Sequence, residues 1–183
     1  MTRILDIRRL DQKGIQRGRV TVSVPGERVS VMPVPVPEGV SNKVAQSIAM
    51  GAVKDWLPSA AEDYSFSVLP GKGPDRTVLI AGRDDLAEWT KSLQAAGLSG
   101  VSVLPDYLWL PWKEGVLPLF TLADQRIAVR YGATLGFTAE ADLAFDMLDQ
   151  LAATSPLEID EVWVNDSRAV AAEHWGNKLI EVG

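Results

Sequence analysis

The order of local patterns along the chain constrains its fold more than its composition does. A hairpin-like pattern, a helix-like pattern and a strand-like pattern follow one another near residues 19–69, and the same order returns near 117–165. Strands that alternate with helices are typical of α/β domains, in which helices cover a sheet. The loose repeat therefore predicts two similar α/β lobes, with the boundary near Lys113–Val116.

The predicted first lobe covers residues 1–113, of which 1–18 are polar, rich in arginine and expected to be poorly ordered. Arg19–Val24 and Arg28–Val34 alternate polar and apolar residues around Pro25-Gly26, a pattern that predicts a β-hairpin. A helix over 41–57 follows, with Ser41 as its N-cap and Trp56 on its core-facing side. Strands are predicted at 63–69 and 76–81. The next predicted helix is capped by Asp84, carries Leu86, Trp89 and Leu93 on one face, and closes at Gly97.

The predicted second lobe covers residues 114–183. Leu117–Leu122 and Arg126–Tyr131 indicate a second hairpin around 123–125. A helix capped by Thr138 is expected to bury Leu143, Met147, Leu148 and Leu151. The remaining predicted elements are strands at 162–165 and 179–182 and a short helix at 167–175.

Composition excludes several classes of protein. The 183 residues include no cysteine, so the chain can form neither disulfides nor thiolate metal sites. No apolar run approaches the ~20 residues needed to span a bilayer, and the N-terminus lacks the apolar core of a signal peptide. These features predict a cytoplasmic chain.

Charge is distributed unevenly. Residues 1–37 hold seven basic and three acidic residues, whereas residues 138–183 hold two basic and ten acidic residues. An acidic C-terminal third argues against nucleic acid as a partner, because binding to phosphates requires a basic face. It favours a basic protein partner, although acidic surface also simply keeps a protein soluble.

The residues for most enzyme mechanisms are missing. His174 is the sole histidine, and a lone histidine in a short helix is more often exposed or structural than catalytic. Gly71-Lys-Gly73 precedes a strand, whereas a phosphate loop leads into a helix N-terminus. No serine-nucleophile motif or Walker motif occurs.

Two nucleotide-related alternatives stay open. A ribonuclease-H-like nuclease would need clustered carboxylates, for which Asp6, Asp124 and Asp146 are the candidates. An actin-like ATPase would need small Gly-rich turns after its two hairpin aspartates, so that backbone amides can reach the phosphates. Arg8 and Arg126 stand where those turns would require glycine, which argues against nucleotide binding.

Five of the six tryptophans divide into two groups, and Trp175 belongs to neither. Trp56, Trp89 and Trp163 fall at positions predicted to face a core. Trp109 and Trp112 lie among prolines, where aromatic residues are either interface hot spots or part of the packing between lobes.

An ordered set of segments resembles one known family. The set comprises Val24–Val29, the proline-ended strand before the helix at 41–57, Glu62–Phe66, the Trp89 helix with Gly97, Leu104–Pro111 and Arg126–Phe137. In this order they resemble the cytoplasmic domain of protein L of the type II secretion system.

This resemblance implies a two-lobed, ribonuclease-H-like or actin-like α/β fold that has lost nucleotide binding. It implies no catalytic residue, no cofactor and no metal. The implied function is that of a non-enzymatic adaptor, which ties the secretion ATPase (protein E) to an inner-membrane platform containing proteins M and F. The resemblance leaves open whether the chain forms a homodimer. Family members continue into a transmembrane helix, so we expect this chain to be the part on the cytoplasmic face of the inner membrane. The alternatives are a nucleotide-binding protein of the pilus-assembly type and an orphan nuclease.

The partner surface is predicted from charge and aromatic residues. Glu158, Asp160, Glu161 and Asp166 flank a predicted strand and should lie along one edge of the second lobe. A basic domain of the ATPase would be attracted to such an edge. In the alternative, these carboxylates are simply solvated and the contact is apolar, through Trp109 and Trp112.

Overall fold

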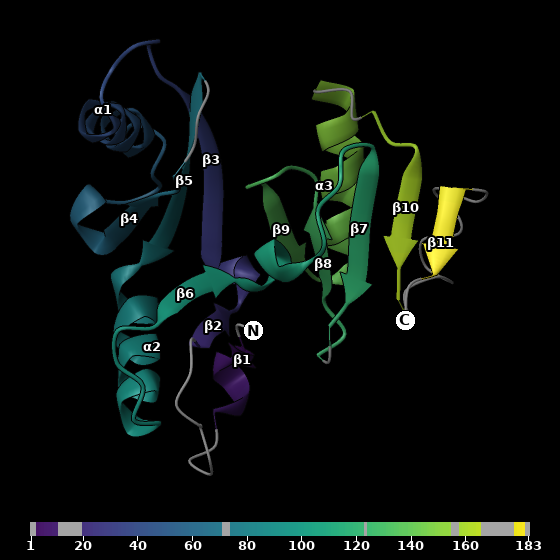
Figure 1. The fold of residues 1–183 in the computed structure, drawn as a ribbon, viewed down its shortest axis with the longest axis horizontal. Coiled ribbons are helices and arrows are strands. Elements are labelled where there is room, and N and C mark those ends of the chain that lie inside the picture. The colour runs from purple at the N-terminus through teal and green to yellow at the C-terminus, as the bar shows by residue number, and fades with distance from the viewer. Residues whose placement is uncertain are drawn as a thin grey trace. The chain divides into compact units, whose positions relative to one another are not determined.

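The computed structural model describes residues 3–10, 20–70, 74–122, 124–154, 158–165 and 178–181 (Figure 1). The chain divides into two compact units, unit 1 from Met1 to Pro105 and unit 2 from Asp106 to Gly183. Residues 106–113 belong to unit 2 in this division, whereas the sequence pattern placed them at the end of the first lobe.

Unit 1 contains two three-stranded sheets. Its strands are β1 (Arg3–Asp6), β2 (Val20–Val24), β3 (Val29–Pro35), β4 (Tyr64–Val68), β5 (Asp75–Gly82) and β6 (Ser102–Pro105). Its α-helices are α1 (Asn42–Lys54) and α2 (Arg83–Ala95), and its short 3-10 turns are η1 (Ile7–Arg9), η2 (Gly26–Arg28) and η3 (Ala61–Asp63). One sheet has the parallel order β1-β2-β6, and the other has the antiparallel order β3-β5-β4.

Alternation along β5 divides the core of unit 1 in two. Val78 and Ile80 pack against α1, where Ala49 and Val53 are buried. Leu79 lies in the other cluster, which contains Trp89 of α2 and the valines of β2. Because successive residues of a strand face opposite sides of the sheet, one strand serves both clusters.

Helix α1 begins and faces the core as predicted, but it ends earlier. The Ser41 hydroxyl accepts a hydrogen bond from the Val44 N–H at 3.4 Å, which caps the helix. Ala45, Ala49 and Val53 are buried. The prediction for Trp56 was wrong: the helix ends at Lys54, so its periodicity does not extend to Trp56, which is 76% exposed.

Helix α2 confirms the prediction that Trp89 is buried. It ends in a Schellman motif, in which the Leu98 N–H donates to the Leu93 carbonyl at 2.8 Å and Gly97 has a φ of +71°. The N-cap is Gly82 rather than the predicted Asp84, which lies in the first turn and there complements the helix dipole.

The first predicted hairpin was wrong, although both of its strands exist. β2 lies between β1 and β6, and β3 pairs with β5 in the other sheet. Thr21 and Ser23 are buried as well as the valines, as befits a central strand of a parallel sheet. The chain turns between β2 and β3 through the 3-10 turn η2, not through the two-residue turn of a tight hairpin.

The described start of the chain, predicted to be poorly ordered, contains β1, which pairs with β2.

The described residues of unit 2 form a five-stranded mixed sheet and one long helix (Figure 1). Its elements are η4 (Asp106–Trp109), β7 (Val116–Thr121), β8 (Ile127–Arg130), β9 (Gly136–Ala139), α3 (Ala141–Thr154), β10 (Glu161–Val164) and β11 (Leu179–Glu181). The strand order is β11-β10-β7-β8-β9, with β10 parallel to both of its neighbours. The hairpin of β7 and β8 confirms the second predicted hairpin, and Gln125 takes the positive φ at its turn.

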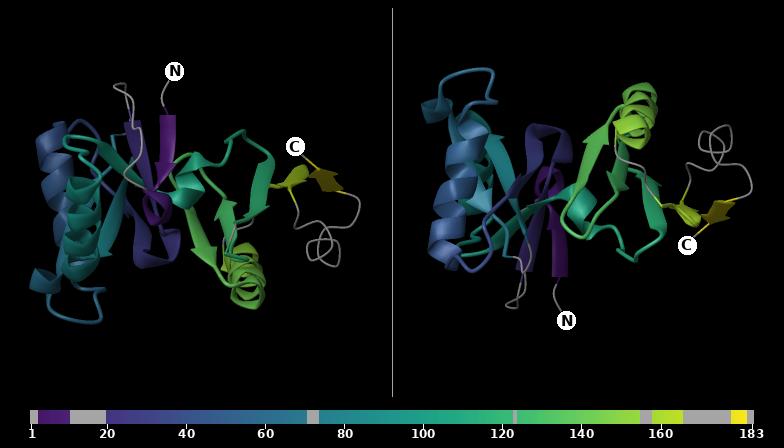
Figure 2. Two further views of the ribbon diagram at one scale, coloured as in Figure 1. Left: turned by 90° about the horizontal axis from the view of Figure 1, so that it is seen from below. Right: turned by 90° about the horizontal axis from the view of Figure 1, so that it is seen from above.

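The two faces of this sheet have different covers. Helix α3 covers one face, where Phe145 and Leu148 pack against Val162 and Val164 (Figure 2). On the other face η4 packs against β8, with Tyr107 fully buried beside Ala128. Burial raises the pKa of Tyr107 above its ordinary value near 10, so the phenol stays neutral.

Three predictions for unit 2 were wrong in detail. Thr138 lies in β9, where its hydroxyl donates to Asp106, and it does not cap α3. The helix buries Ala144 and Phe145 instead of Leu143 and Met147, because it carries two apolar stripes and the one with Ala144, Phe145 and Leu148 packs against the sheet. Trp163 is half-buried on the face opposite Val162 and Val164, because neighbouring strand residues alternate between faces.

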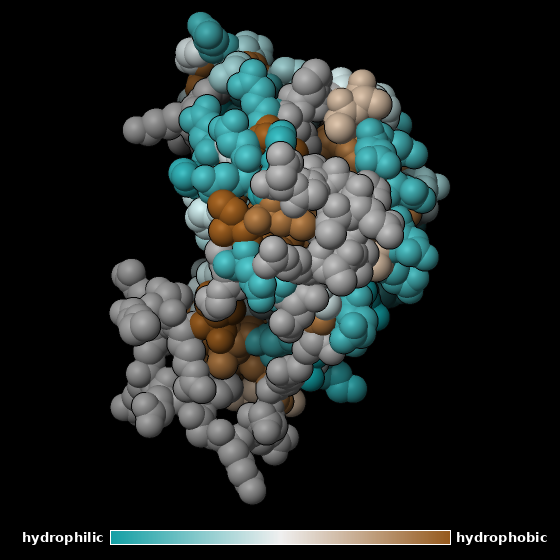
Figure 3. Space-filling model, turned by 90° about the vertical axis from the view of Figure 1, so that its right-hand side faces the viewer, coloured by the Kyte–Doolittle hydropathy of each residue, from teal (hydrophilic) through white to brown (hydrophobic). Residues whose placement is uncertain are grey.

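No helix within the described residues is long and apolar enough to cross a membrane. On the face drawn in Figure 3, hydrophobic residues reach the surface in separate patches between hydrophilic ones. The predicted short helix at 167–175 lies outside the described residues.

Candidate functional site

The candidate site is a hollow of about 410 Å³ on unit 2, beside the start of β7. Trp112, Tyr131 and Ile159 supply its large apolar side chains, and Glu114 and Glu158 supply carboxylates. Trp112 is 38% exposed and lies in the exposed stretch 111–114, so part of its indole is available to a partner. An exposed tryptophan beside carboxylates is a suitable anchor for a protein with basic residues.

Gly115, which lines this hollow, is hydrogen-bonded to the segment that carries Asp160 and Glu161. Its carbonyl accepts from the Asp160 N–H at 2.8 Å and from the Glu161 N–H at 3.2 Å. Gly115 has a φ of +76°, which favours glycine, and a Cβ at this position would lie 2.6 Å from the Asp160 carboxylate. The glycine therefore lets the backbone of Asp160 and Glu161 come close to the start of β7.

Arg130 holds the segment that carries Trp112. Its guanidinium donates to the carbonyls of Leu108 and Leu110 at 2.9 and 2.6 Å, and also to those of Gly132 and Ala133. Burial lowers the pKa of Arg130 from its ordinary value, but a guanidinium stays charged at neutral pH. A charged group bonded to several carbonyls fixes the chain on either side of the hollow.

The structure separates the predicted acidic residues into different environments. Glu158 is exposed and lines the hollow, and Asp160 is exposed beside Gly115. Glu161 is half-buried and accepts a hydrogen bond from the Trp163 indole at 3.0 Å. Asp166 lies outside the described residues.

The two predicted aromatic residues also differ. Trp112 lines the hollow, whereas Trp109 is half-buried in η4 with its indole nitrogen buried. The geometry thus brings Trp112, Glu158 and Asp160 to one region of unit 2. Sequence reasoning missed Gly115 and Arg130, although the Glu-Gly pair at 114–115 is a turn signal that points to the first of them.

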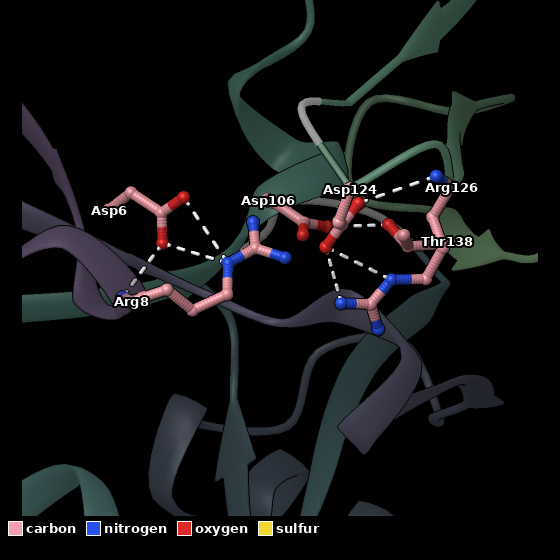
Figure 4. Close-up of polar contacts among 6 residues, drawn as sticks. All are labelled: Asp6, Arg8, Asp106, Asp124, Arg126 and Thr138. Atoms are coloured by element: carbon pink, nitrogen blue, oxygen red, sulfur yellow. Dashed lines mark hydrogen bonds and ion pairs between the residues drawn. The ribbon is translucent and has the colours of Figure 1, made fainter.

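The two Asp-x-Arg segments make the same pattern of hydrogen bonds (Figure 4). Asp6 accepts from the Arg8 backbone N–H at 2.9 Å and from the Arg8 guanidinium at 3.0 Å. Asp124 accepts from the Arg126 backbone N–H at 3.3 Å and from its guanidinium at 3.1 Å. Each aspartate is therefore bound by an arginine two residues later, and each turn's backbone N–H already has a carboxylate acceptor.

Within the described residues, no three His, Asp or Glu side chains are grouped so that they could hold a metal ion. Asp146, the third carboxylate considered for a nuclease, lies on the exposed side of α3. Gly71–Gly73 and His174 lie outside the described residues.

Comparison with solved structures defines the class of fold. The cytoplasmic domain of EpsL, an inner-membrane component of the type II secretion system of Vibrio cholerae, matches with a TM-score of 0.62 and 25% identity over 79% of this chain and 60% of that chain. The PilM–PilN type IV pilus biogenesis complex matches with a TM-score of 0.63 and 13% identity over 92% of this chain and 70% of that chain. The mixed α/β structure and these neighbours confirm the prediction of an actin-like fold.

The family model for type II secretion system protein L matches residues 8–179. The chain belongs to this family, which confirms the resemblance seen in the sequence. The "Putative type II secretion system protein L" of Escherichia coli (strain K12) is 28% identical over 140 residues, which are 76% of this chain and 33% of that protein. The chain thus spans about a third of the length of this relative.

Proposed function

We propose that the chain is a non-enzymatic adaptor, which recruits the secretion ATPase (protein E) to the inner-membrane platform of the type II secretion system. Membership of an assembly-component family supports this role. The observation that carries the proposal is the hollow on unit 2, where exposed Trp112 lies with Glu158 and near Asp160. The chain would act on the cytoplasmic side of the membrane, with platform proteins M and F and a second copy of the chain as further partners.

The chemistry of the hollow fits a basic protein surface. Trp112 offers apolar area at its rim, and Glu158 and Asp160 offer negative charge beside it. Long-range attraction between these carboxylates and a basic domain raises the association rate, while an aromatic side chain that becomes buried in the contact slows dissociation. The Asp160 backbone N–H donates to the Gly115 carbonyl, so little backbone conformational entropy is lost when a partner contacts this residue.

Replacing the anchor tests the adaptor role. In calorimetric titration with the secretion ATPase, we expect Trp112→Ala to weaken binding by at least about 2 kcal/mol, the usual threshold for a hot spot. The control is Trp56→Ala, which removes an even more exposed tryptophan from unit 1 and should leave the affinity unchanged. Equal losses for both variants, or no binding by the wild-type chain, would rule out recruitment through the hollow.

A nucleotide-binding protein is the second candidate, because the fold is shared with PilM. The two Asp-x-Arg turns argue against it, since each carboxylate and turn N–H is bound within the chain. Calorimetry with ATP and Mg²⁺ should therefore show no heat of binding. A dissociation constant in the micromolar range would overturn the adaptor proposal in favour of this candidate.

A further inference from the structure

Helix α3 leaves an apolar stripe in contact with solvent. Leu143 is 54% exposed and Met147 is 37% exposed, and residues four apart lie one above the other on a helix. Leu151, one further turn along, is half-buried and continues the stripe. The helix already buries Ala144, Phe145 and Leu148 against the sheet, so the core does not need this second stripe.

An acidic line runs beside the apolar stripe. Asp142, Asp146 and Asp149 are all exposed and are spaced four and three residues apart, so they share one side of the helix. None of the ion pairs found among the described residues involves these three carboxylates. Like charges at this spacing destabilise a helix, and α3 has no basic residue in its last turn to offset them.

The charge of the surrounding chain identifies the occupant. Residues 131–167 contain eight acidic residues and no lysine or arginine. Anionic lipid headgroups would be repelled by this surface. A second copy docking α3 against α3 would place the acidic lines in one symmetric contact, which like-charge repulsion disfavours.

We propose that the stripe of Leu143, Met147 and Leu151 on α3 is a docking surface for a basic amphipathic helix of a partner protein. Apolar side chains of that helix would cover the leucines and the methionine. Methionine suits such a surface because its flexible side chain adapts to different partners. Lysines or arginines beside the partner's apolar stripe would face Asp142, Asp146 and Asp149. The surface is distinct from the Trp112 hollow and does not depend on the function proposed for that hollow.

The test uses a fluorescently labelled helical peptide of leucines and lysines, with all leucines on one stripe. The matched control peptide has the same composition in an order that breaks the stripe. Binding to the full chain is followed by fluorescence anisotropy, and the contact is located by hydrogen–deuterium exchange. We expect the amphipathic peptide to bind about tenfold more tightly than the control peptide and to protect residues 141–154.

Two pairs of variants make the test specific. Leu143→Ser with Met147→Ser should weaken binding about tenfold. The control, Val44→Ser with Met50→Ser, changes side chains of similar exposure on α1, 47% and 37%, and should have no effect. All four positions are partly exposed, so the fold should persist, and thermal melting followed by circular dichroism checks this.

A charge variant provides a second route. Asp142→Asn, Asp146→Asn and Asp149→Asn together should weaken binding and reduce its dependence on salt. Equal affinity of the two peptides, protection confined to other residues, or equal losses in the α3 and α1 variants would each overturn the proposal. Dimerisation in sedimentation, or binding to anionic vesicles, that is lost in Leu143→Ser with Met147→Ser would also overturn the proposal. Either result would mean that a second copy or a lipid surface, and not a basic helix, covers the stripe.

Discussion

We expect Trp89→Ala to cost about 3–5 kcal/mol of the free energy of unfolding, the range for removing a buried large aromatic side chain. Trp89 lies in the cluster that joins α2 to the parallel sheet, with Leu79, Val22 and Val24 among its neighbours. It also borders an apolar hollow of about 140 Å³, so its removal would enlarge a space that is already poorly filled. Urea unfolding followed by circular dichroism measures the loss.

The control for this change is again Trp56→Ala, which removes the same side chain from an exposed position. Its cost should stay within about 0.5 kcal/mol, as for most surface changes. A loss below about 1 kcal/mol for Trp89→Ala would mean that α2 does not cover this core.

The second large effect concerns Gly136 in β9. A Cβ at this position would lie 2.5 Å from a ring carbon of Tyr107 and 2.5 Å from the Val129 carbonyl oxygen. The ring is fully buried and the carbonyl belongs to the neighbouring strand, so neither can move cheaply. We therefore expect Gly136→Ala to destabilise the chain by about 2–3 kcal/mol through overpacking.

Gly51→Ala is a matched control with the opposite expected sign. Gly51 lies inside α1, and a methyl group added there would meet open space, since nothing lies within 4 Å of the Cβ position. Alanine is favoured over glycine in a helix by about 1 kcal/mol, so this variant should be stabilised. If Gly136→Ala unfolds at the same urea concentration as the wild type, Tyr107 does not pack on β9 as described.

Three local signals in the sequence predicted local structure correctly, whereas the caps predicted at Asp84 and Thr138 were wrong. Ser41 caps α1, Gly97 closes α2, and the second hairpin forms at its predicted turn. These features depend on a few neighbouring residues, whose conformations are set by hydrogen bonds within one or two turns of the chain.

Features that depend on distant partners were not predictable. Alternation identified β2 and β3 as strands but could not show that they pair in different sheets. The pattern of α3 contains two apolar stripes, and only the shape of the sheet decides which one is buried. Trp163 follows the same rule, because α3 covers the face of β10 that carries Val162 and Val164.

The candidate site shows the same division. Composition and charge singled out Trp112, Glu158 and Asp160 separately, but the fold brings them to one region. Gly115 and Arg130 position that region through backbone carbonyls, and hydrogen bonds to distant carbonyls leave no pattern in a single sequence.

Glu158 and Asp160, which lie at or beside the Trp112 hollow, are proposed to attract the secretion ATPase, and the association rate is the direct measure of that attraction. The variant is Glu158→Lys with Asp160→Lys, which leaves out Glu161 because that side chain is bonded to Trp163. The control is Glu62→Lys with Asp63→Lys, which makes the same change of charge at two exposed positions of unit 1.

The association rate is measured by stopped-flow mixing with the ATPase at about 0.05 M and about 0.5 M salt. The two salt concentrations separate attraction by Glu158 and Asp160 from non-specific charge effects. At low salt we expect Glu158→Lys with Asp160→Lys to associate about tenfold more slowly than both the wild type and the control. At high salt the three association rates should converge. An association rate for Glu158→Lys with Asp160→Lys that equals the control's at both salt concentrations would contradict the account.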